Sequence, residues 1–243
     1  MTLGAIILAN LIMAIGASVQ TVAGFGMSLI ALPLLLGLDA SLAPGPILFS
    51  QFLLVLCLSS LDPRAADRGT LLVAGAAAVA GTVAGLYLLS AVSAPQFVLL
   101  TACVLVGVSA MTLFRVDIGL SMTNVFVAGF LCGFCGTTTS VSGPPLVAVM
   151  SGSRRPAEIR ATLALFLLFS TVLSLAGLAA VGKFSFGQLL LSLWISPGVF
   201  LGAFCARRFS AQIDSVVRPR MLFAIASSGA TLIFVGKALI KSL

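Results

Sequence analysis

The chain alternates long apolar segments with short polar or charged turns. Since a helix needs about 20 apolar residues to cross the hydrocarbon core of a bilayer, the long segments predict membrane spans. The uncharged stretches are 1–38, 40–61, 69–114, 118–153, 161–182 and 184–206, and 69–114 is long enough for two spans. The pattern predicts helical elements at 3–19, 24–38, 42–60, 69–90, 96–114, 120–138, 143–152, 158–181, 185–206 and 219–239.

Polar clusters interrupt this apolar pattern twice, 119 residues apart. The first reads Gln20-Thr21-Val22-Ala23-Gly24-Phe25-Gly26, and the second runs from Gly136 to Pro145 with hydroxyl residues at five of positions 137–142. In lipid, a broken helix is tolerated only where protein or a water-filled cavity satisfies the freed backbone groups. Paired breaks at matching places in two halves are typical of the substrate site of a secondary transporter.

A helix that starts at such a break exposes its first N–H groups and the positive end of its dipole, which favours an anion. Glycines let a ligand approach the backbone closely, and neutral polar side chains add donors. The expected substrate-binding residues are Gln20, Thr21, Gly24 and Gly26 in the first break, Thr137, Thr138, Thr139, Ser140, Ser142 and Gly143 in the second, and Gln51 and Ser170 at mid-span in the third and eighth elements. The competing interpretation is that the hydroxyls only bond to carbonyl groups of the preceding helical turn.

Composition agrees with a membrane protein, because 60% of residues are hydrophobic and 8% are charged, whereas a soluble domain has roughly a quarter charged residues. We expect an all-α integral membrane protein. The net charge of +7 comes from basic residues at span ends, where they orient the protein, so nucleic-acid binding is not expected. The chain has no histidine, and its five cysteines lie in apolar spans, so neither a metal site nor a cofactor is expected.

Two halves of the chain share a glycine pattern, since Gly81-x-x-x-Gly85 recurs as Gly198-x-x-x-Gly202. Small residues four apart let helix backbones approach closely. The arginine-rich loops occupy different positions in the two halves, and the positive-inside rule places all of them in the cytoplasm. We therefore expect one transmembrane domain, 1–243, made of two inverted repeats, 1–117 and 118–243. Each would have five elements, with broken or re-entrant helices meeting near mid-membrane and both termini outside.

At these residues the sequence resembles the TauE/SafE family of sulfite and organosulfur exporters, in which each half has a glycine-rich segment followed by a proline-containing apolar run. The first copy here runs from Gly16 to Gly26 with Pro33 downstream, and the second runs from Gly129 to Gly136 and leads to Gly143-Pro144-Pro145. Where the family usually has consecutive glycines, this sequence reads Gly24-Phe25-Gly26 in the first half and Gly143-Pro144-Pro145 in the second. The resemblance covers nearly the whole chain and implies transport of sulfite or an organosulfonate across the inner membrane of a bacterial cell.

The sequence thus predicts a secondary transporter that exports a small anion by alternating access. An anion channel, an uptake carrier for another small anion and an accessory subunit of a larger complex stay open as alternatives. An intramembrane enzyme is not expected, because no span carries histidine, a Ser/Lys pair or paired aspartates. The expected partners are a small anionic substrate and the lipid bilayer, and whether the chain forms a homodimer stays open.

Overall fold

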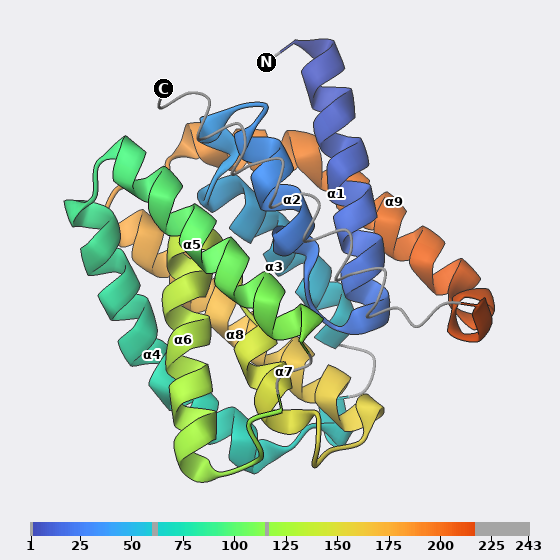
Figure 1. Ribbon diagram of the computed structural model, residues 1–243. Coiled ribbons are helices and arrows are strands. Elements are labelled where there is room, and N and C mark those ends of the chain that lie inside the picture. The colour runs from blue at the N-terminus through green and yellow to red at the C-terminus, as the bar shows by residue number, and fades with distance from the viewer. Residues whose placement is uncertain (1, 60–62, 115–116, 217–243) are drawn as a thin grey trace.

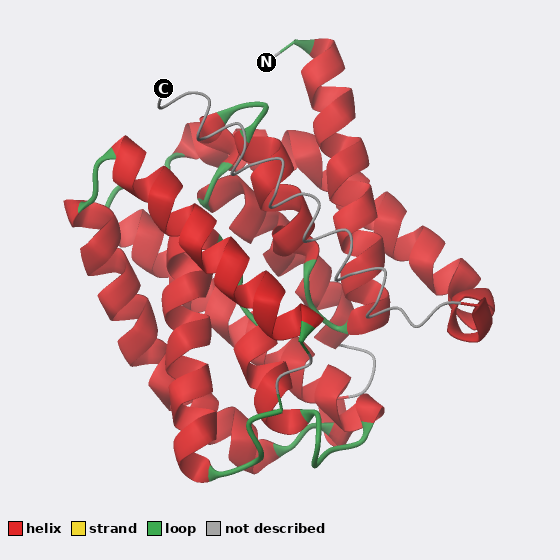
Figure 2. Cartoon of the chain, in the orientation of Figure 1, coloured by secondary structure: helices red, strands yellow, loops and turns green. Residues whose placement is uncertain are grey.

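The computed structural model describes residues 2–59, 63–114 and 117–216, and all regular structure in these ranges is helical (Figures 1 and 2). The α-helices are α1 (Leu3–Ala23), α2 (Met27–Leu36), α3 (Gly45–Ser59), α4 (Arg68–Ala91), α5 (Ala94–Leu113), α6 (Met122–Thr139), α7 (Pro144–Met150), α8 (Pro156–Ala180) and α9 (Phe186–Val216). Two short 3-10 helices, η1 (Ala40–Leu42) and η2 (Pro63–Ala65), lie before α3 and α4. The predicted element 219–239 falls outside the described residues.

Six of the described helices, namely α1, α4, α5, α6, α8 and α9, are long and apolar enough to cross a bilayer. Helices α2, α3 and α7 have 10, 15 and 7 residues, and at about 1.5 Å per residue none of them reaches across roughly 30 Å of hydrocarbon. Large apolar side chains such as Leu72, Tyr87 and Phe204 are exposed on the outside of the bundle. A surface of this kind suits lipid, and the predicted multi-pass, all-α membrane protein is confirmed.

Most helix ends lie within three residues of the predicted ones, and local chemistry explains several of them. The side chains of Thr2, Asp67 and Ser121 each accept a hydrogen bond from a backbone N–H in the first turn of α1, α4 and α6, as N-caps do. The largest difference is at the end of α9, which continues ten residues past its predicted end to Val216. The arginines at 207 and 208 end the apolar span, but residues 207–216 contain no glycine or proline to end the helix.

Two pairs of helices, α1 with α9 and α4 with α6, are in close backbone contact where glycines leave no side chain between them. A β-carbon at Gly198 of α9 would collide with the carbonyl oxygen of Asn10 of α1, and a β-carbon at Gly81 of α4 would collide with the carbonyl oxygen of Phe130 of α6. Helices pack this closely in membranes where small residues leave room. The predicted packing role of the glycine pattern is therefore confirmed.

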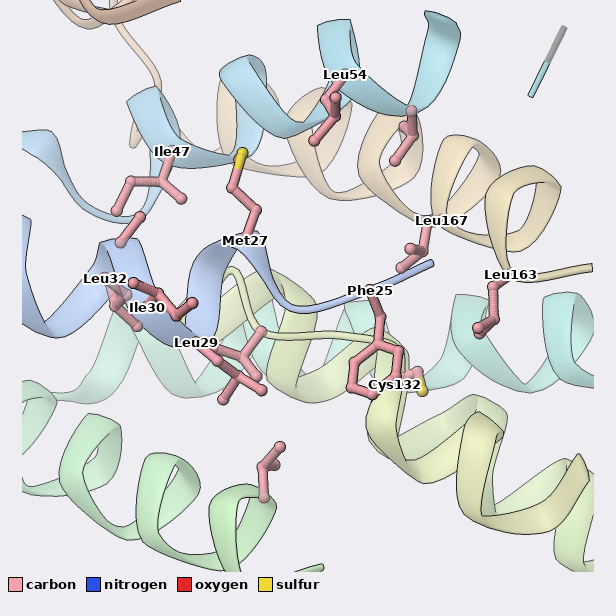
Figure 3. Packing of buried hydrophobic residues seen from close by; sticks show 14 of the residues in the cluster. Phe25, Met27, Leu29, Ile30, Leu32, Ile47, Leu54, Cys132, Leu163 and Leu167 are labelled. Carbon is pink, nitrogen blue, oxygen red and sulfur yellow. The ribbon is translucent and has the colours of Figure 1, made fainter. Parts of the chain in front are cut away.

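The centre of the bundle is formed by α3 and α8, which contact each other, while α3 also packs on α9 and α4 packs on α8. Figure 3 shows the apolar core around the start of α2, where Met27 points toward α3. In the same view, Phe25 lies beside Leu167 of α8 and Cys132 of α6. The core thus surrounds the connection between α1 and α2.

Basic residues of the described chain gather at one end of the bundle. The guanidinium group of Arg154 forms an ion pair with Asp67, at 2.6 Å, and with Glu158, at 3.2 Å. These contacts join the loop before α4 to the loop before α8. Nearby in the chain are Arg64, Arg68, Arg155 and Arg160, and Arg207 donates to the carbonyl of Cys57 at the end of α3. Lys183 lies in the turn between α8 and α9 at the other end. This distribution agrees with the predicted gathering of the arginine-rich loops on one side.

Asp67 makes this end of the fold sensitive to acid. Burial raises the pKa of the Asp67 carboxyl, but hydrogen bonds from Thr70 and Arg154 outweigh burial and hold the pKa below its ordinary value. A carboxyl whose pKa is lowered by folding stabilises the fold above its unfolded pKa, and this contribution is lost as the pH falls through the folded pKa. We expect Asp67→Asn to lower the Tm at neutral pH and to flatten the dependence of the Tm on pH in the acid range. Two identical Tm-against-pH curves in detergent would contradict this.

Candidate functional site

The first break is a sharp reversal of the chain. Helix α1 continues through Gln20 and Thr21 to Ala23, four residues beyond its predicted end, because neither residue stops a helix. It ends at Gly24, whose φ is 87°, and α2 starts after Gly26, whose φ is 109°. Both angles lie in the region that favours glycine. A β-carbon at Gly16 would lie 2.9 Å from the carbonyl oxygen of Met27, so α2 folds back against α1 and the two form a bent hairpin.

The second break repeats this geometry between α6 and α7. Helix α6 ends at Thr139, the chain turns through Ser140 with φ 60° and Gly143 with φ 110°, and α7 follows. A β-carbon at Gly136 would lie 3.2 Å from the β-carbon of Ser142. The segment after α6 therefore also packs back on the helix that precedes it. Both breaks therefore take the form of a bent hairpin.

The two breaks contact each other. A β-carbon at Gly143 would lie 3.0 Å from the β-carbon of Phe25 and 3.9 Å from Leu167 of α8. A β-carbon at Gly24 would lie 3.7 Å from Leu163 and 3.2 Å from the Cγ atom of Arg160, both on α8. Helix α8 therefore supports both hairpins, and Phe25 fills the space where they meet (Figure 3).

Gln20 links the two helices of the first hairpin and carries an unused donor. Its Oε1 atom accepts the backbone N–H of Met27 at 3.0 Å, so the side chain caps α2. Its Nε2 atom is buried and has no hydrogen-bond partner among the described residues, although the side chain is 0% exposed. A buried amide donor that lacks a partner calls for a ligand or an ordered water molecule.

Two serine hydroxyls at the second hairpin are also buried without a partner in the described part of the chain. They belong to Ser142, in the turn itself, and to Ser170, on α8. Both lie near Gly136, since a β-carbon there would be 3.2 Å from Oγ of Ser142 and 3.7 Å from Oγ of Ser170. Three of the predicted substrate-binding residues, Gln20, Ser142 and Ser170, thus hold unpaired buried donors at the breaks.

The predicted threonines differ from these serines, because each donates its hydroxyl proton to a carbonyl one turn earlier in its own helix. The distances are 2.8 Å for Thr21, 2.9 Å for Thr137, 2.8 Å for Thr138 and 2.8 Å for Thr139. This is the local bonding that the competing interpretation described. For an anion, which needs donors, these four threonines are a weaker choice than the unpartnered serines. Ser140 donates to the carbonyl of Pro44 at 2.9 Å, so its proton is also in use.

Helix α7 offers few backbone amides at its start. Pro144 and Pro145 have no N–H, and the N–H of Val147 donates to the carbonyl of Gly143. The prediction that amides at this helix start bind a ligand stays a prediction. Side-chain donors are the more numerous candidates for holding an anion at the second break.

A hydrogen bond of Gln51 connects α3 to the first hairpin. Its Oε1 atom accepts the hydroxyl proton of Ser28 at 2.7 Å, and both residues are buried. Ser28 lies in the first turn of α2, next to the capped Met27. The predicted residue Gln51 is therefore close to the predicted break, through a contact that sequence spacing could not reveal.

Around the second hairpin the electrostatics come mainly from dipoles. No charged residue occurs in 118–153 or 161–182, which contain α6, α7 and most of α8, and the nearest charge to the first hairpin is Arg160. Within the described residues, no group of three or more His, Cys, Asp and Glu side chains could hold a metal ion. The arrangement is suited to binding a small polar or anionic molecule through neutral donors.

A comparison with protein-family models matches residues 8–232 to sulfite exporter TauE/SafE. The chain belongs to this family. The match covers nearly the whole sequence, so the resemblance that the two glycine-rich copies indicated is confirmed. TauE/SafE is a family of membrane transporters, which agrees with the six long apolar helices of the described residues. The same comparisons matched the chain to no curated protein and to no solved structure.

Three residues at the two breaks of this TauE/SafE protein were not among the predicted binding residues. Phe25 lies in the contact between the breaks, Arg160 is near Gly24, and Cys132 lies beside Phe25 (Figure 3). Phe25 could have been noticed, because it replaces a glycine in the family's usual run. Neither Arg160 nor Cys132 carries a sequence signal, since their roles depend on how α8 and α6 pack.

Proposed function

We propose that this TauE/SafE protein is a secondary transporter that exports a small anion, sulfite or an organosulfonate, by alternating access. The observation that carries the proposal is the contact between the two breaks at Phe25 and Gly143, with an unpartnered buried donor beside each break. Donors in a site with little water interact strongly with the oxygens of an anion. The substrate would bind between the two hairpins.

Helix contacts support the two inverted repeats, 1–117 and 118–243. Helix α1 packs on α9 and its counterpart α6 packs on α4, while α3 packs on α9 and its counterpart α8 packs on α4. Each contact maps onto another when the two halves are exchanged. In Figure 1, α1 runs from the top of the view downward and α6 runs upward, as opposite orientations require. Rocking of the two halves around a shared site would expose it to each side in turn.

The membrane potential favours export. With the arginine-rich end in the cytoplasm of a bacterium, as the positive-inside rule requires, an anion leaving the cell gains about 2.3 kcal/mol per charge per 100 mV. The sequence has no P-loop motif for a nucleotide, so the gradients of charge and substrate would drive the flux. The spans 69–114, 118–153 and 161–182 contain no carboxylate that could relay a proton.

Flux measurements on the purified protein in liposomes test the proposal. We expect efflux of labelled methanesulfonate or sulfite to saturate with concentration and to be stimulated by unlabelled substrate on the opposite side. Counterflow of this kind requires a carrier whose site faces one side at a time. A conductance far above carrier turnover, without counterflow, would instead indicate an anion channel. Absence of flux and of ligand-dependent thermal stabilisation with every sulfur oxyanion would contradict the transport function altogether.

A further inference from the structure

Two unpartnered hydroxyls at the second break face the same bare helix backbone. The side chains of Ser142 and Ser170 are 4% and 1% exposed, and neither Oγ atom has a hydrogen-bond partner within the described ranges. Measured from the place that a β-carbon of Gly136 would occupy, the two oxygens lie 3.2 and 3.7 Å away. Gly136, the Ser142 hydroxyl and the Ser170 hydroxyl therefore form a small polar cradle, which we call the Gly136 cradle.

Neighbouring hydroxyls show that local partners are within reach of serines and threonines in this region. Thr137 and Ser174 share a hydrogen bond of 2.8 Å, and Ser140 reaches the carbonyl of Pro44. Leaving a buried hydroxyl unpaired costs about 1–3 kcal/mol. Since no described residue pairs with either hydroxyl, a ligand or a water molecule can complete their hydrogen bonds.

The surroundings of the cradle limit the charge of that ligand. Its residues belong to the uncharged segments 118–153 and 161–182, and the nearest charge along α8 is Arg160, ten residues from Ser170. Ten residues of helix correspond to about 15 Å. Neutral donors compensate one buried negative charge far better than two, because the cost of removing an ion from water rises steeply with its charge.

We propose that the Gly136 cradle binds one oxygen of a singly charged sulfur oxyanion and that the protein discriminates against doubly charged ones. This inference rests on the proposed transport function and specifies its substrate class. Alkyl sulfonates and hydrogensulfite carry one charge on an SO₃ group, whereas sulfate and fully deprotonated sulfite carry two. Sulfite is accordingly carried as hydrogensulfite, and the proton travels on the substrate.

Binding of two small anions to the full-length protein in detergent tests the charge class. We expect methanesulfonate to raise the Tm and to inhibit sulfite efflux from liposomes at concentrations at least tenfold lower than those of sulfate. Sulfite efflux should increase as the pH is lowered and the hydrogensulfite fraction rises, whereas methanesulfonate efflux should not follow this titration. Equal competition by sulfate and methanesulfonate would overturn the discrimination by charge.

Substitutions in the cradle test the site itself. Ser142→Ala and Ser170→Ala should each weaken methanesulfonate binding by about tenfold, since a hydrogen bond to a charged group is lost. Gly136→Ala should weaken it at least as much, because the added methyl group fills the cradle and lies 3.2 Å from the β-carbon of Ser142; the Tm of this variant is measured alongside, so that a loss of fold is told apart from a loss of binding. Ser192→Ala is the matched control: this serine is also buried on a membrane helix, but its hydroxyl already donates to the carbonyl of Gln188.

The possible outcomes separate this inference from the proposed function. If the parent protein transports methanesulfonate and all three cradle variants bind it like the parent, the cradle is a structural water site and the inference is wrong. If the cradle variants and Ser192→Ala lose affinity equally, the effect is not specific to the cradle and the inference is also wrong. If the parent neither binds nor transports any sulfur oxyanion, the proposed function fails first, and the inference falls with it.

Discussion

Gln20→Glu is expected to abolish anion transport while the protein stays folded. The substitution keeps the shape of the side chain and the oxygen that accepts the N–H of Met27, so α2 stays capped. It removes the unpartnered Nε2 donor and places a negative charge where the substrate is proposed to bind. Two like charges about 4 Å apart repel by about 4 kcal/mol at an effective dielectric constant of 20, which corresponds to a loss of roughly a thousandfold in affinity.

Efflux of methanesulfonate from liposomes measures this effect, because the charge of that anion does not change with pH. The matched control is Gln96→Glu, which makes the same chemical change at an exposed position where the side-chain oxygen caps the N–H of Ser93. It should transport at the parent rate. Acidic pH should partly restore the Gln20→Glu variant, because a protonated carboxyl is neutral and can donate. Parent-like transport by Gln20→Glu at neutral pH would show that the first break is not part of the site.

The order of helices and breaks was predictable because apolar length and interruption are local properties of a membrane sequence. Span limits follow from where charges begin, as at Arg68 and Asp117, and the breaks follow from glycines that adopt positive φ, as at Gly24 and Gly143. The exact end of α1 was not predictable in this way, because Gln20 and Thr21 are polar and yet remain helical. Polarity alone does not end a helix whose hydroxyls can bond to its own carbonyls.

The site was predictable only as a set of candidates. Sequence could place Thr139 and Ser142 in the same polar cluster, but it could not tell that the first hydroxyl is used within α6 while the second has no described partner. That difference depends on backbone direction, since Thr139 is still helical and Ser142 lies in the turn. The proximity of Ser170 to the second break depends on how α8 packs against both hairpins, and this tertiary arrangement cannot be read from the sequence.

Gly81→Ala and Gly198→Ala are expected to destabilise the fold to a similar degree. Each added β-carbon would collide with a carbonyl oxygen of the facing helix, that of Phe130 for Gly81 and that of Asn10 for Gly198. The helix pairs must then separate, and overpacking of this kind costs about 1–3 kcal/mol, which is a fall in Tm of about 5 °C for a protein of this size. Thermal unfolding in detergent, followed by intrinsic fluorescence, measures both variants.

Gly107→Ala is the matched control, because this glycine is also inside a membrane helix but has no atom within 4 Å of the added β-carbon. It should leave the Tm unchanged or raise it slightly, since alanine favours the helix. The two damaging substitutions lie on different helix pairs with no shared partner, so their effects should add in the double variant. If the two repeats are equivalent, the two substitutions should lower the Tm equally and additively. In each repeat the first helix, α1 or α6, packs on the fourth helix of the other repeat, α9 or α4. A loss confined to one of the two glycines would argue against that equivalence, even if both hairpins proved essential for transport.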